Sequence, residues 1–455
     1  MIQQAIELAR RGREKAATEL LDLIGIPSVS ALREHGDDVR RAADWIARFL
    51  AGTGMKVEVV TGAGHPVVVA EWMERPGAPV LAVYGHYDVQ PADPLPQWLT
   101  PPFEPQVREG FVYGRGATDD KGQLLANMMA AQHALAAGGP PVNLRFLIEG
   151  EEEIESMVLP AFLEKNAARL GTDYLFIADG HFTAPGMPSL TTGLRGLLYV
   201  EIEVAGPAAD LHSGIFGGVA PNPFNSLCHI ISGLKGRDGR VSIPGFYDDI
   251  RPPAPVEIES WRSLPLGEHD YLELTGAPAL EGELDYSAVE RTSSRPTLDV
   301  HGIMGGFTGE GTKTVIPALA TAKVSMRLVP DQDPGRILAG LRQRVQSLAT
   351  PGVRVGVREL AQTPAVLLGT DHAGVAAATR AFEAAFGAPP VLVREGGSIP
   401  VTADFQRLLR PHILATGFGL PDDGLHSPNE RFSLDHYHRG TEMLLHLMDE
   451  LGRAG

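Results

Sequence analysis

Residues 80–91, VLAVYGHYDVQP, join a short apolar run to an imidazole and a carboxylate. The run Val80 to Val83 has the continuous apolar character of a strand that is covered on both faces of a sheet. In an extended chain, residues two apart point the same way, so His86 and Asp88 can face one spot beyond the end of this strand. A metal-bound imidazole often needs a carboxylate on its other nitrogen, but a His-x-Asp pair alone is more often an ordinary hydrogen bond.

The sequence on either side of this strand predicts an α/β domain. The first 191 residues alternate helical and strand patterns, which is typical of a central, mostly parallel sheet flanked by helices. The half-exposed alternation over 198–204 then indicates an inserted α+β domain over 192–370, with an irregular, Pro-rich and acidic stretch at 243–297. The first domain resumes over 371–455. We predict helices at 6–24, 39–50, 123–137, 224–234, 337–348, 373–386 and 441–451, and strands at 57–60, 67–70, 80–83, 142–148, 174–177, 321–329, 353–357, 391–393 and 413–416.

Composition excludes several classes of function. The net charge of -17 argues against a nucleic acid partner, which would call for a basic stripe. No apolar stretch is long enough to cross a membrane, and the N-terminus has no signal core, so we expect a soluble, cytoplasmic protein without a membrane partner. The single cysteine, Cys228, excludes a disulfide framework and a thiolate-rich metal site.

Acidic and imidazole residues follow several predicted strands. Asp119 and Asp120 precede the helix at 123–137, where capping and metal binding are about equally good explanations. The acidic run 149–153 follows another strand, Asp179 follows a third, and His426 lies in a C-terminal loop. Singly, Asp179 and His426 would be surface residues more often than ligands. Together these residues suit paired zinc, manganese or cobalt ions, bridged by one of the adjacent aspartates.

Seven motifs in order make a more specific signal than any one of them. The chain resembles the di-metal peptidase family of carnosinase, cytosolic non-specific dipeptidase, aminoacylase and carboxypeptidase G, and is most similar to the branch of carnosinase and the non-specific dipeptidase. The resemblance implies a catalytic domain at 1–191 and 371–455 and a lid or dimerisation domain at 192–370. The motifs are GHYDVQP at 85–91, GRGATDDKG at 114–122, EGEEE at 149–153, DLHSG at 210–214, GTKTVIP at 311–317, REGGSIP at 394–400 and HSPNE at 426–430.

The resemblance also implies a role for each matching residue. His86, Asp119 and Asp179 are expected to hold one metal ion, and Asp119, Glu153 and His426 the other, with zinc the preferred metal and manganese or cobalt as alternatives. Asp88 is expected to orient His86, and the peptide bond between Asp119 and Asp120 to be cis. Glu152 would be the general base, and Glu151 its non-catalytic neighbour.

Residues of the insert are expected to meet the substrate. By resemblance, His212 reaches the active site of the partner subunit in a homodimer and stabilises the oxyanion. Arg327 suits capture of a C-terminal carboxylate, although on its own it would be read as a surface arginine. Thr314, Ser398, Gly396 and Gly397 are expected to be further substrate contacts. His181, His436, His438 and His446 match no ligand of the family, and we expect them to be structural.

The resulting hypothesis is a di-metal hydrolase that cleaves a peptide bond next to a free carboxylate, most simply in dipeptides, with metal-activated water as the nucleophile. The same metals and base would also serve an N-acyl amino acid deacylase or a carboxypeptidase. A binding protein that retained the fold without activity is a more distant alternative, against which the intact Glu152 and ligand set argue.

Overall fold

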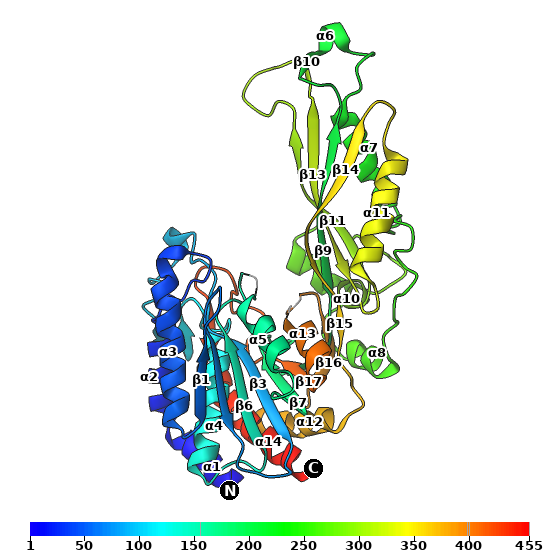
Figure 1. Cartoon of the computed structure of the whole chain (residues 1–455). Coiled ribbons are helices and arrows are strands. Elements are labelled where there is room, and N and C mark those ends of the chain that lie inside the picture. The colour runs from blue at the N-terminus through cyan, green and yellow to red at the C-terminus, as the bar shows by residue number, and fades with distance from the viewer. Residues whose placement is uncertain (155, 398, 400, 455) are drawn as a thin grey trace. The chain divides into compact units, whose positions relative to one another are not determined.

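The computed structural model describes residues 1–154, 156–397, 399 and 401–454. The chain forms two compact units (Figure 1). Unit 1 contains Met1–Thr192, Leu368–Val393 and the C-terminal part from Val401, and unit 2 contains Gly193–Leu367 and the short segment that starts at Arg394. Within the described residues, no helix is both long enough and apolar enough to cross a membrane.

A nine-stranded mixed sheet is the centre of unit 1, with the order β1-β2-β6-β3-β7-β17-β8-β15 and with β16 paired to β8. Its middle strands β6, β3, β7 and β17 are parallel to one another. The strands are β1 (Lys56–Val60), β2 (Val67–Trp72), β3 (Val80–His86), β6 (Asn143–Glu149), β7 (Tyr174–Ala178), β8 (Ser189–Leu194), β15 (Val366–Leu367), β16 (Val391–Glu395) and β17 (His412–Thr416).

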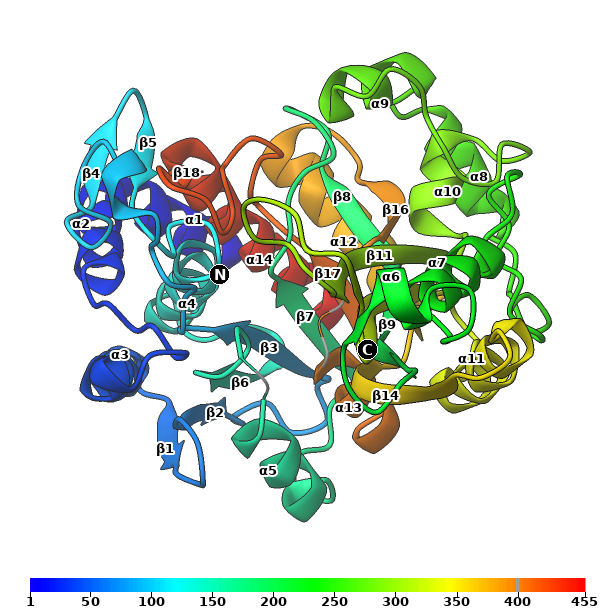
Figure 2. The same ribbon diagram turned by 90° about the horizontal axis from the view of Figure 1, so that it is seen from above.

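Helices cover both faces of this sheet, as the α/β pattern predicts. Figure 2 shows α4 and α14 on one face and α5 and α13 on the other. Buried apolar side chains of β3, β6, α4 and α14 join in one core. The helices are α1 (Ile2–Arg11), α2 (Arg13–Ile24), α3 (Gly36–Gly52), α4 (Lys121–Ala136), α5 (Val158–Asn166), α12 (Ala373–Phe386), α13 (Val401–Leu408) and α14 (Leu434–Ala454), and a small sheet contains β4 (Gln106–Arg108), β5 (Phe111–Tyr113) and β18 (Arg431–Ser433).

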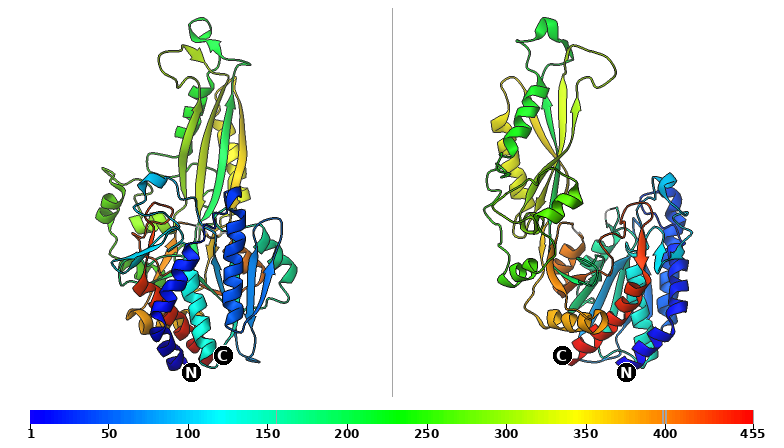
Figure 3. Two further views of the ribbon diagram at one scale, coloured as in Figure 1. Left: turned by 90° about the vertical axis from the view of Figure 1, so that its left-hand side faces the viewer. Right: turned by 180° about the vertical axis from the view of Figure 1, so that it is seen from behind.

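Unit 2 is built on a four-stranded antiparallel sheet with the order β11-β13-β9-β14. Helices α7 and α11 cover one face of it (Figure 3), where alternate residues of β9 and β13 are buried. The elements are β9 (Gly196–Ala205), β10 (Leu211–His212), α6 (Ser213–Phe216), α7 (Pro223–Leu234), α8 (Pro255–Arg262), α9 (Glu268–Thr275), α10 (Ala288–Ser293), β11 (Thr297–Gly305), β12 (Val315–Ile316), β13 (Leu319–Leu328), α11 (Pro334–Leu348) and β14 (Arg354–Thr363).

Three local predictions were wrong. The continuous helix at 6–24 is two helices, because Gly12 leaves the helical conformation with φ -88° and ψ 4°, although its N–H still donates to Leu8 O at 2.9 Å as in a helix. The stretch 243–297 is not irregular, since it forms α8, α9 and α10; the Ser287 hydroxyl and the Glu290 carboxylate cap α10 reciprocally. The outer strand pairs β1-β2, β2-β6 and β8-β17 are antiparallel, which makes the sheet mixed rather than mostly parallel.

Candidate active site

Parallel strands of unit 1 deliver the predicted ligands to one edge of the sheet. The carboxyl ends of parallel strands meet at the same edge, where open α/β sheets bind their ligands. His86 is the last residue of β3, Asp179 follows β7, and Glu153 follows β6. Asp119 lies just before α4, and His426 lies in the loop between β17 and β18. The strand pattern read from the sequence thus explains why distant residues converge.

These five residues form two groups that share Asp119, and the candidate ligand atoms of each group all lie within 4.8 Å of one another. In the first group, His86 Nε2 lies 3.1 Å from Asp119 Oδ1 and 3.6 Å from Asp179 Oδ1. In the second, His426 Nε2 lies 2.9 Å from Asp119 Oδ2 and 3.4 Å from Glu153 Oε2. Each oxygen of Asp119 therefore faces a different group, as a carboxylate that bridges two cations would.

The electrostatics of the two groups fit cation binding. Burial disfavours the charged form of His86, but the carboxylates of Asp179, Asp119 and Asp88 outweigh it and raise the pKa of His86 well above its usual range. Hydrogen bonds to Asp119 and Glu153 raise the pKa of His426 to about 10. Burial of Asp119 opposes ionisation, yet the two imidazoles bring its pKa below the usual range. Such a carboxylate cluster favours positive charge, which a metal ion would supply with both imidazoles neutral.

The donor set also fits a metal by chemistry and by geometry. His86 Nε2 is buried and makes no hydrogen bond within the described part of the chain, although two carboxylate oxygens lie close to it. A buried polar atom that faces carboxylates without bonding to them needs another partner. Imidazole nitrogen with carboxylate oxygen suits zinc, manganese and cobalt. The site thus supports two divalent ions held by His86, Asp179, Asp119, Glu153 and His426.

Asp88 connects the first group to the acidic loop after β6. Its carbonyl oxygen lies 3.1 Å from His86 Nδ1, and its carboxylate Oδ1 lies 3.4 Å from the same nitrogen. The carboxylate also accepts the N–H groups of Glu152 at 3.2 Å and Glu153 at 3.1 Å. Asp88 therefore fixes the ring of His86 and the backbone of the next ligand together, a wider role than the sequence predicts.

The three consecutive glutamates 151–153 have different surroundings. The Glu151 carboxylate accepts the N–H groups of His65, Met157 and Val158, so it connects the segment at His65 to the segment that begins α5. Glu153 joins the second ligand group. Burial raises the pKa of Glu152 well above its usual range, and neighbouring carboxylates add to the rise while His86 opposes it. Bound cations would counter this rise. Among the described residues, the Glu152 carboxylate neither accepts a backbone N–H group, as that of Glu151 does, nor belongs to a ligand group, as that of Glu153 does.

The family follows from the chain as a whole. The model of Peptidase family M20/M25/M40 matches residues 82–450, which include all five candidate ligands. The chain belongs to this family. It is therefore a metallopeptidase, as the seven motifs imply.

Individual relatives match this M20/M25/M40 peptidase over 83% or more of its length. It is 32% identical to the Cys-Gly metallodipeptidase of Schizosaccharomyces pombe over 99% of this chain and 98% of the relative. It is 33% identical to the human Beta-Ala-His dipeptidase over 83% of this chain and 76% of the relative. Among solved structures, a dipeptidase from Saccharomyces cerevisiae matches with a TM-score of 0.82 and 29% identity, covering 100% of this chain and 99% of that one. A metallo-carboxypeptidase of the family from Sulfolobus solfataricus matches with a TM-score of 0.84 and 31% identity, covering 96% and 99%.

One carboxylate with a clear place in this M20/M25/M40 peptidase received no role from the sequence. Glu430 is fully buried, and its Oε1 accepts the N–H groups of Thr118 at 3.0 Å and Asp119 at 3.1 Å. Its Oε2 accepts the N–H of Gly116 at 3.1 Å and pairs with the Arg115 guanidinium at 2.6 Å. Glu430 lies four residues after His426, so one loop supplies a candidate ligand and also holds the backbone of the bridging aspartate.

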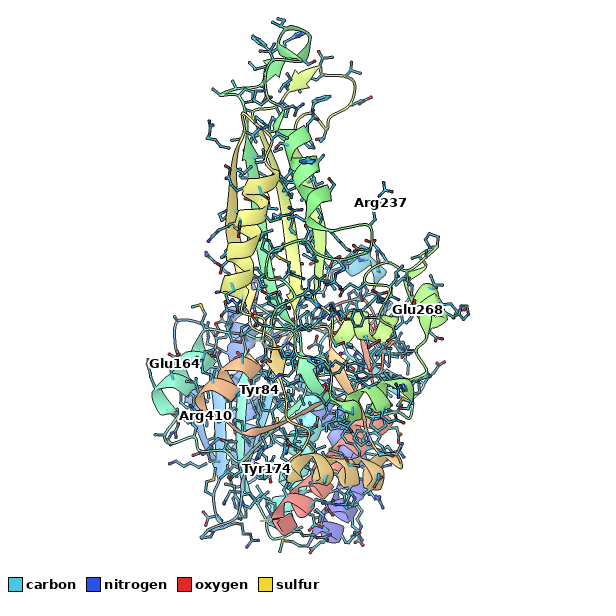
Figure 4. The ribbon with its side chains drawn as sticks, turned by 90° about the vertical axis from the view of Figure 1, so that its right-hand side faces the viewer. Tyr84, Glu164, Tyr174, Arg237, Glu268 and Arg410 are labelled. Carbon is cyan, nitrogen blue, oxygen red and sulfur yellow. The ribbon has the colours of Figure 1, made fainter. Side chains whose placement is uncertain are left out.

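Glu149 is a second buried carboxylate without an assigned role. Tyr84 of β3 (Figure 4) donates its hydroxyl to Glu149 Oε1 at 2.8 Å. Burial raises the pKa of Glu149 to about 7. Because Glu149 ends β6 directly before the acidic loop, this bond anchors the strand that precedes Glu152.

The predicted substrate contacts of unit 2 lie in two places, one at the separate β10-β12 pair and one near the last residue of β13. His212 and Thr314 are neighbours, since His212 pairs with Val315 between β10 and β12 and Ser213 N donates to Thr314 O at 3.1 Å. Arg327 lies near the other end of β13, eight residues beyond Leu319. At about 3.3 Å a residue, this part of the strand spans about 26 Å. Within one chain, a dipeptide is too short to touch both ends.

The remaining predicted residues are less informative. Gly396 and Gly397 follow β16, and Ser398 lies outside the described residues. His181 Nδ1 lies 2.9 Å from Phe182 O and His436 Nδ1 lies 2.8 Å from Phe418 O, which are structural contacts. His438 and His446 both lie on α14.

Proposed function

We propose that this protein is a dipeptidase that cleaves the peptide bond next to a free C-terminal carboxylate, with zinc as the preferred metal. The observation that carries the proposal is Asp119, whose two oxygens face two separate groups of ligands. The printed names of the Schizosaccharomyces pombe and human relatives, both dipeptidases, favour this substrate class over N-acyl amino acids. We place the enzyme in the cytoplasm.

In this proposal each residue near the ligand groups has one task. Two bound divalent ions would polarise the substrate carbonyl and make a water molecule more acidic. Glu152 takes the proton of the attacking water and later passes it to the leaving amine. Asp88 keeps His86 in one tautomer and fixes the backbone N–H of Glu152, which places the base.

Unit 2 is proposed to bind the substrate. Arg327 takes its carboxylate, because a guanidinium offers two parallel donors to one carboxylate. Thr314, Gly396, Gly397 and Ser398 are proposed as further contacts. His212 has an exposed ring whose Nδ1 accepts the N–H of Gly214 at 2.9 Å, which leaves Nε2–H free to donate to an oxyanion.

We propose that the working form is a homodimer in which His212 and Thr314 serve the partner subunit. The span between these residues and Arg327 within unit 2 supports this arrangement, since two copies are needed to bring both ends to one dipeptide. An exposed apolar surface also supports it. The edge strand β11 exposes Val300, Ile303 and Met304, and α6 with its following loop exposes Ile215 and Val219.

A substrate screen tests the proposed function. The purified protein, stripped of metal and reloaded with zinc or with manganese, is assayed on dipeptides, β-alanyl dipeptides, N-acetyl amino acids and longer peptides. Hydrolysis of dipeptides with the highest kcat/KM supports the proposal. Preference for N-acetyl amino acids would make it a deacylase. Release of single C-terminal residues from longer peptides would make it a carboxypeptidase, like its relative from Sulfolobus solfataricus.

A further inference from the structure

A half-buried arginine without an ion pair among the described residues lies directly before β9. Arg195 comes directly before Gly196, and its Nε and NH1 atoms are buried without a hydrogen bond among the described residues. No carboxylate of the described chain forms an ion pair with it. An unpaired buried charge is costly, and buried charges in proteins normally have a partner. Arg195 therefore has unmet capacity for an anion.

A second arginine shares the face of the sheet on which Arg195 lies. Arg327 of β13 pairs with Leu197 of β9, two residues after Arg195. Cross-strand partners point to the same face, and so do residues two apart in an extended chain. The opposite face carries the buried residues Leu198 and Met326 under α7 and α11. Burial, followed by the positive charge of Arg327, lowers the pKa of Arg195 to about 10.

The carboxylate of Asp299 raises the pKa of Arg195 without pairing with it. Asp299 of β11 acts on Arg195 electrostatically, but it forms no ion pair with Arg195 or Arg327 in the described parts of the chain. Its Oδ2 instead accepts a hydrogen bond from the Thr297 hydroxyl at 3.1 Å. Two like charges therefore lie on one face of unit 2 without an ion pair to any described residue, an arrangement that a negatively charged ligand would stabilise.

The glycine segment after β16 lies directly against Arg195. Arg195 N donates to Glu395 O at 3.2 Å, and a Cβ added to Gly396 would lie 2.7 Å from Arg195 NH2. Any side chain at position 396 would displace the guanidinium. The absence of a side chain here is thus tied to the position of Arg195, in addition to any contact of the glycine backbone with substrate.

We propose that Arg195 and Arg327 together bind the carboxylate of the substrate, with Gly396 setting the position of the first guanidinium. The proposal rests on the proposed function and narrows its substrate class. Two cations require a ligand with a full negative charge, because a neutral C-terminal amide leaves both guanidiniums without a counterion. The enzyme therefore selects peptides with a free C-terminal acid through a pair of arginines, and not through Arg327 alone.

The experiment compares Arg195→Met with Arg358→Met, whose arginine lies in the same sheet but is exposed and paired with Glu201. Both variants and the wild type are assayed on Ala-Leu and on its C-terminal amide. Arg195→Met is expected to raise KM for Ala-Leu about 10- to 100-fold, with a smaller change in kcat, and to lower the preference for acid over amide by a similar factor. Arg195→Lys recovers part of the loss, and Arg358→Met changes neither value.

Two further measurements separate the possible failures. Arg195→Met should unfold at the same temperature as the wild type or higher, since it removes an unpaired charge. If the wild type cleaves Ala-Leu but Arg195→Met keeps the preference for acid over amide, the arginine pair is wrong and the dipeptidase function stands. If the wild type cleaves no dipeptide, that function is wrong, and calorimetric binding of leucine against leucinamide decides the role of Arg195. If the wild type and Arg195→Met distinguish leucine from leucinamide equally well in this binding experiment, the proposed pairing of Arg195 with Arg327 is also wrong.

Discussion

Glu430 offers the sharpest test of how the candidate metal centre is held together. Its carboxylate accepts three backbone N–H groups and pairs with Arg115, whose side chain is equally buried. Breaking a buried ion pair by removing one partner costs about 3 to 5 kcal/mol. Glu430→Ala would also orphan the three N–H groups at about 1 to 3 kcal/mol each, which approaches the whole stability of many proteins. Glu430→Gln keeps the shape of the side chain, so it is the variant chosen for this test.

Glu430→Gln is expected to weaken metal binding as well as stability. The amide loses the charge that pairs with Arg115, and its NH2 group cannot accept from donors, so the backbone of Asp119 is held less firmly. We expect metal affinity to fall about 10- to 100-fold, as is typical when a residue that orients a ligand is changed. The assay is calorimetric titration of metal-free protein with Zn²⁺, together with thermal unfolding.

The matched control is Glu71→Gln. Glu71 pairs with the buried Arg145 at 2.8 Å on the neighbouring strands β2 and β6, but neither residue belongs to a ligand group. This variant should lose stability and keep its metal affinity. If Glu430→Gln loses stability as Glu71→Gln does and still binds both ions with wild-type affinity, Glu430 does not position Asp119 and the reasoning is refuted.

Three further predictions concern the base, the partner subunit and pH. Glu152→Gln should lower kcat about 100- to 10,000-fold while two metal ions stay bound; retained turnover would exclude Glu152 as the base. Mixing His212→Ala with Glu152→Gln subunits should restore about a quarter of wild-type activity, since random pairing makes half of the dimers hybrid with one intact site each; no recovery would mean that each chain completes its own site. Burial, with a contribution from Lys15, lowers the pKa of His133 on α4 to about 4. An unfolded histidine has a pKa near 6.5, so between about pH 4 and pH 6.5 the unfolded chain binds more protons at His133 than the folded chain does. The stability that neutral His133 gives the folded chain is therefore lost as the pH falls from about 6.5 to about 4. The melting temperature of metal-free His133→Gln should therefore fall less over this range than that of the metal-free wild type, and parallel curves would contradict the assignment.

Local patterns were enough to predict much of unit 1. The apolar run before His86 is β3, and the acidic residues that follow the neighbouring strands converge because those strands are parallel. Antiparallel pairing of the outer strands escaped prediction, since a short apolar strand has the same pattern in either direction. Gly12 also escaped, because one glycine within a long helical pattern is usually tolerated.

The residues that the sequence could not assign depend on contacts between distant parts of the chain. Glu430 is more than 300 positions from the loop that it holds. From the sequence alone, a glutamate is expected on the surface, in contact with water. Arg195 lies between Leu194 and the apolar residues of β9, and nothing nearby in the sequence shows that it lacks an ion-pair partner. Thr314 and Arg327 are only 13 positions apart in sequence, yet most of the length of β13 separates them, since Thr314 lies before its first residue and Arg327 near its last.

The long β13 strand has a consequence for how this enzyme could lose its activity. If His212 of a second copy completes the active site, a chain that is fully folded and has bound both metal ions is still inactive at low protein concentration. Activity per chain would then rise with protein concentration, with a midpoint set by the dissociation constant of the dimer. Substitutions on the exposed edge of β11 that weaken the dimer would then show themselves as a loss of activity on dilution, with the metal ligands of each chain intact.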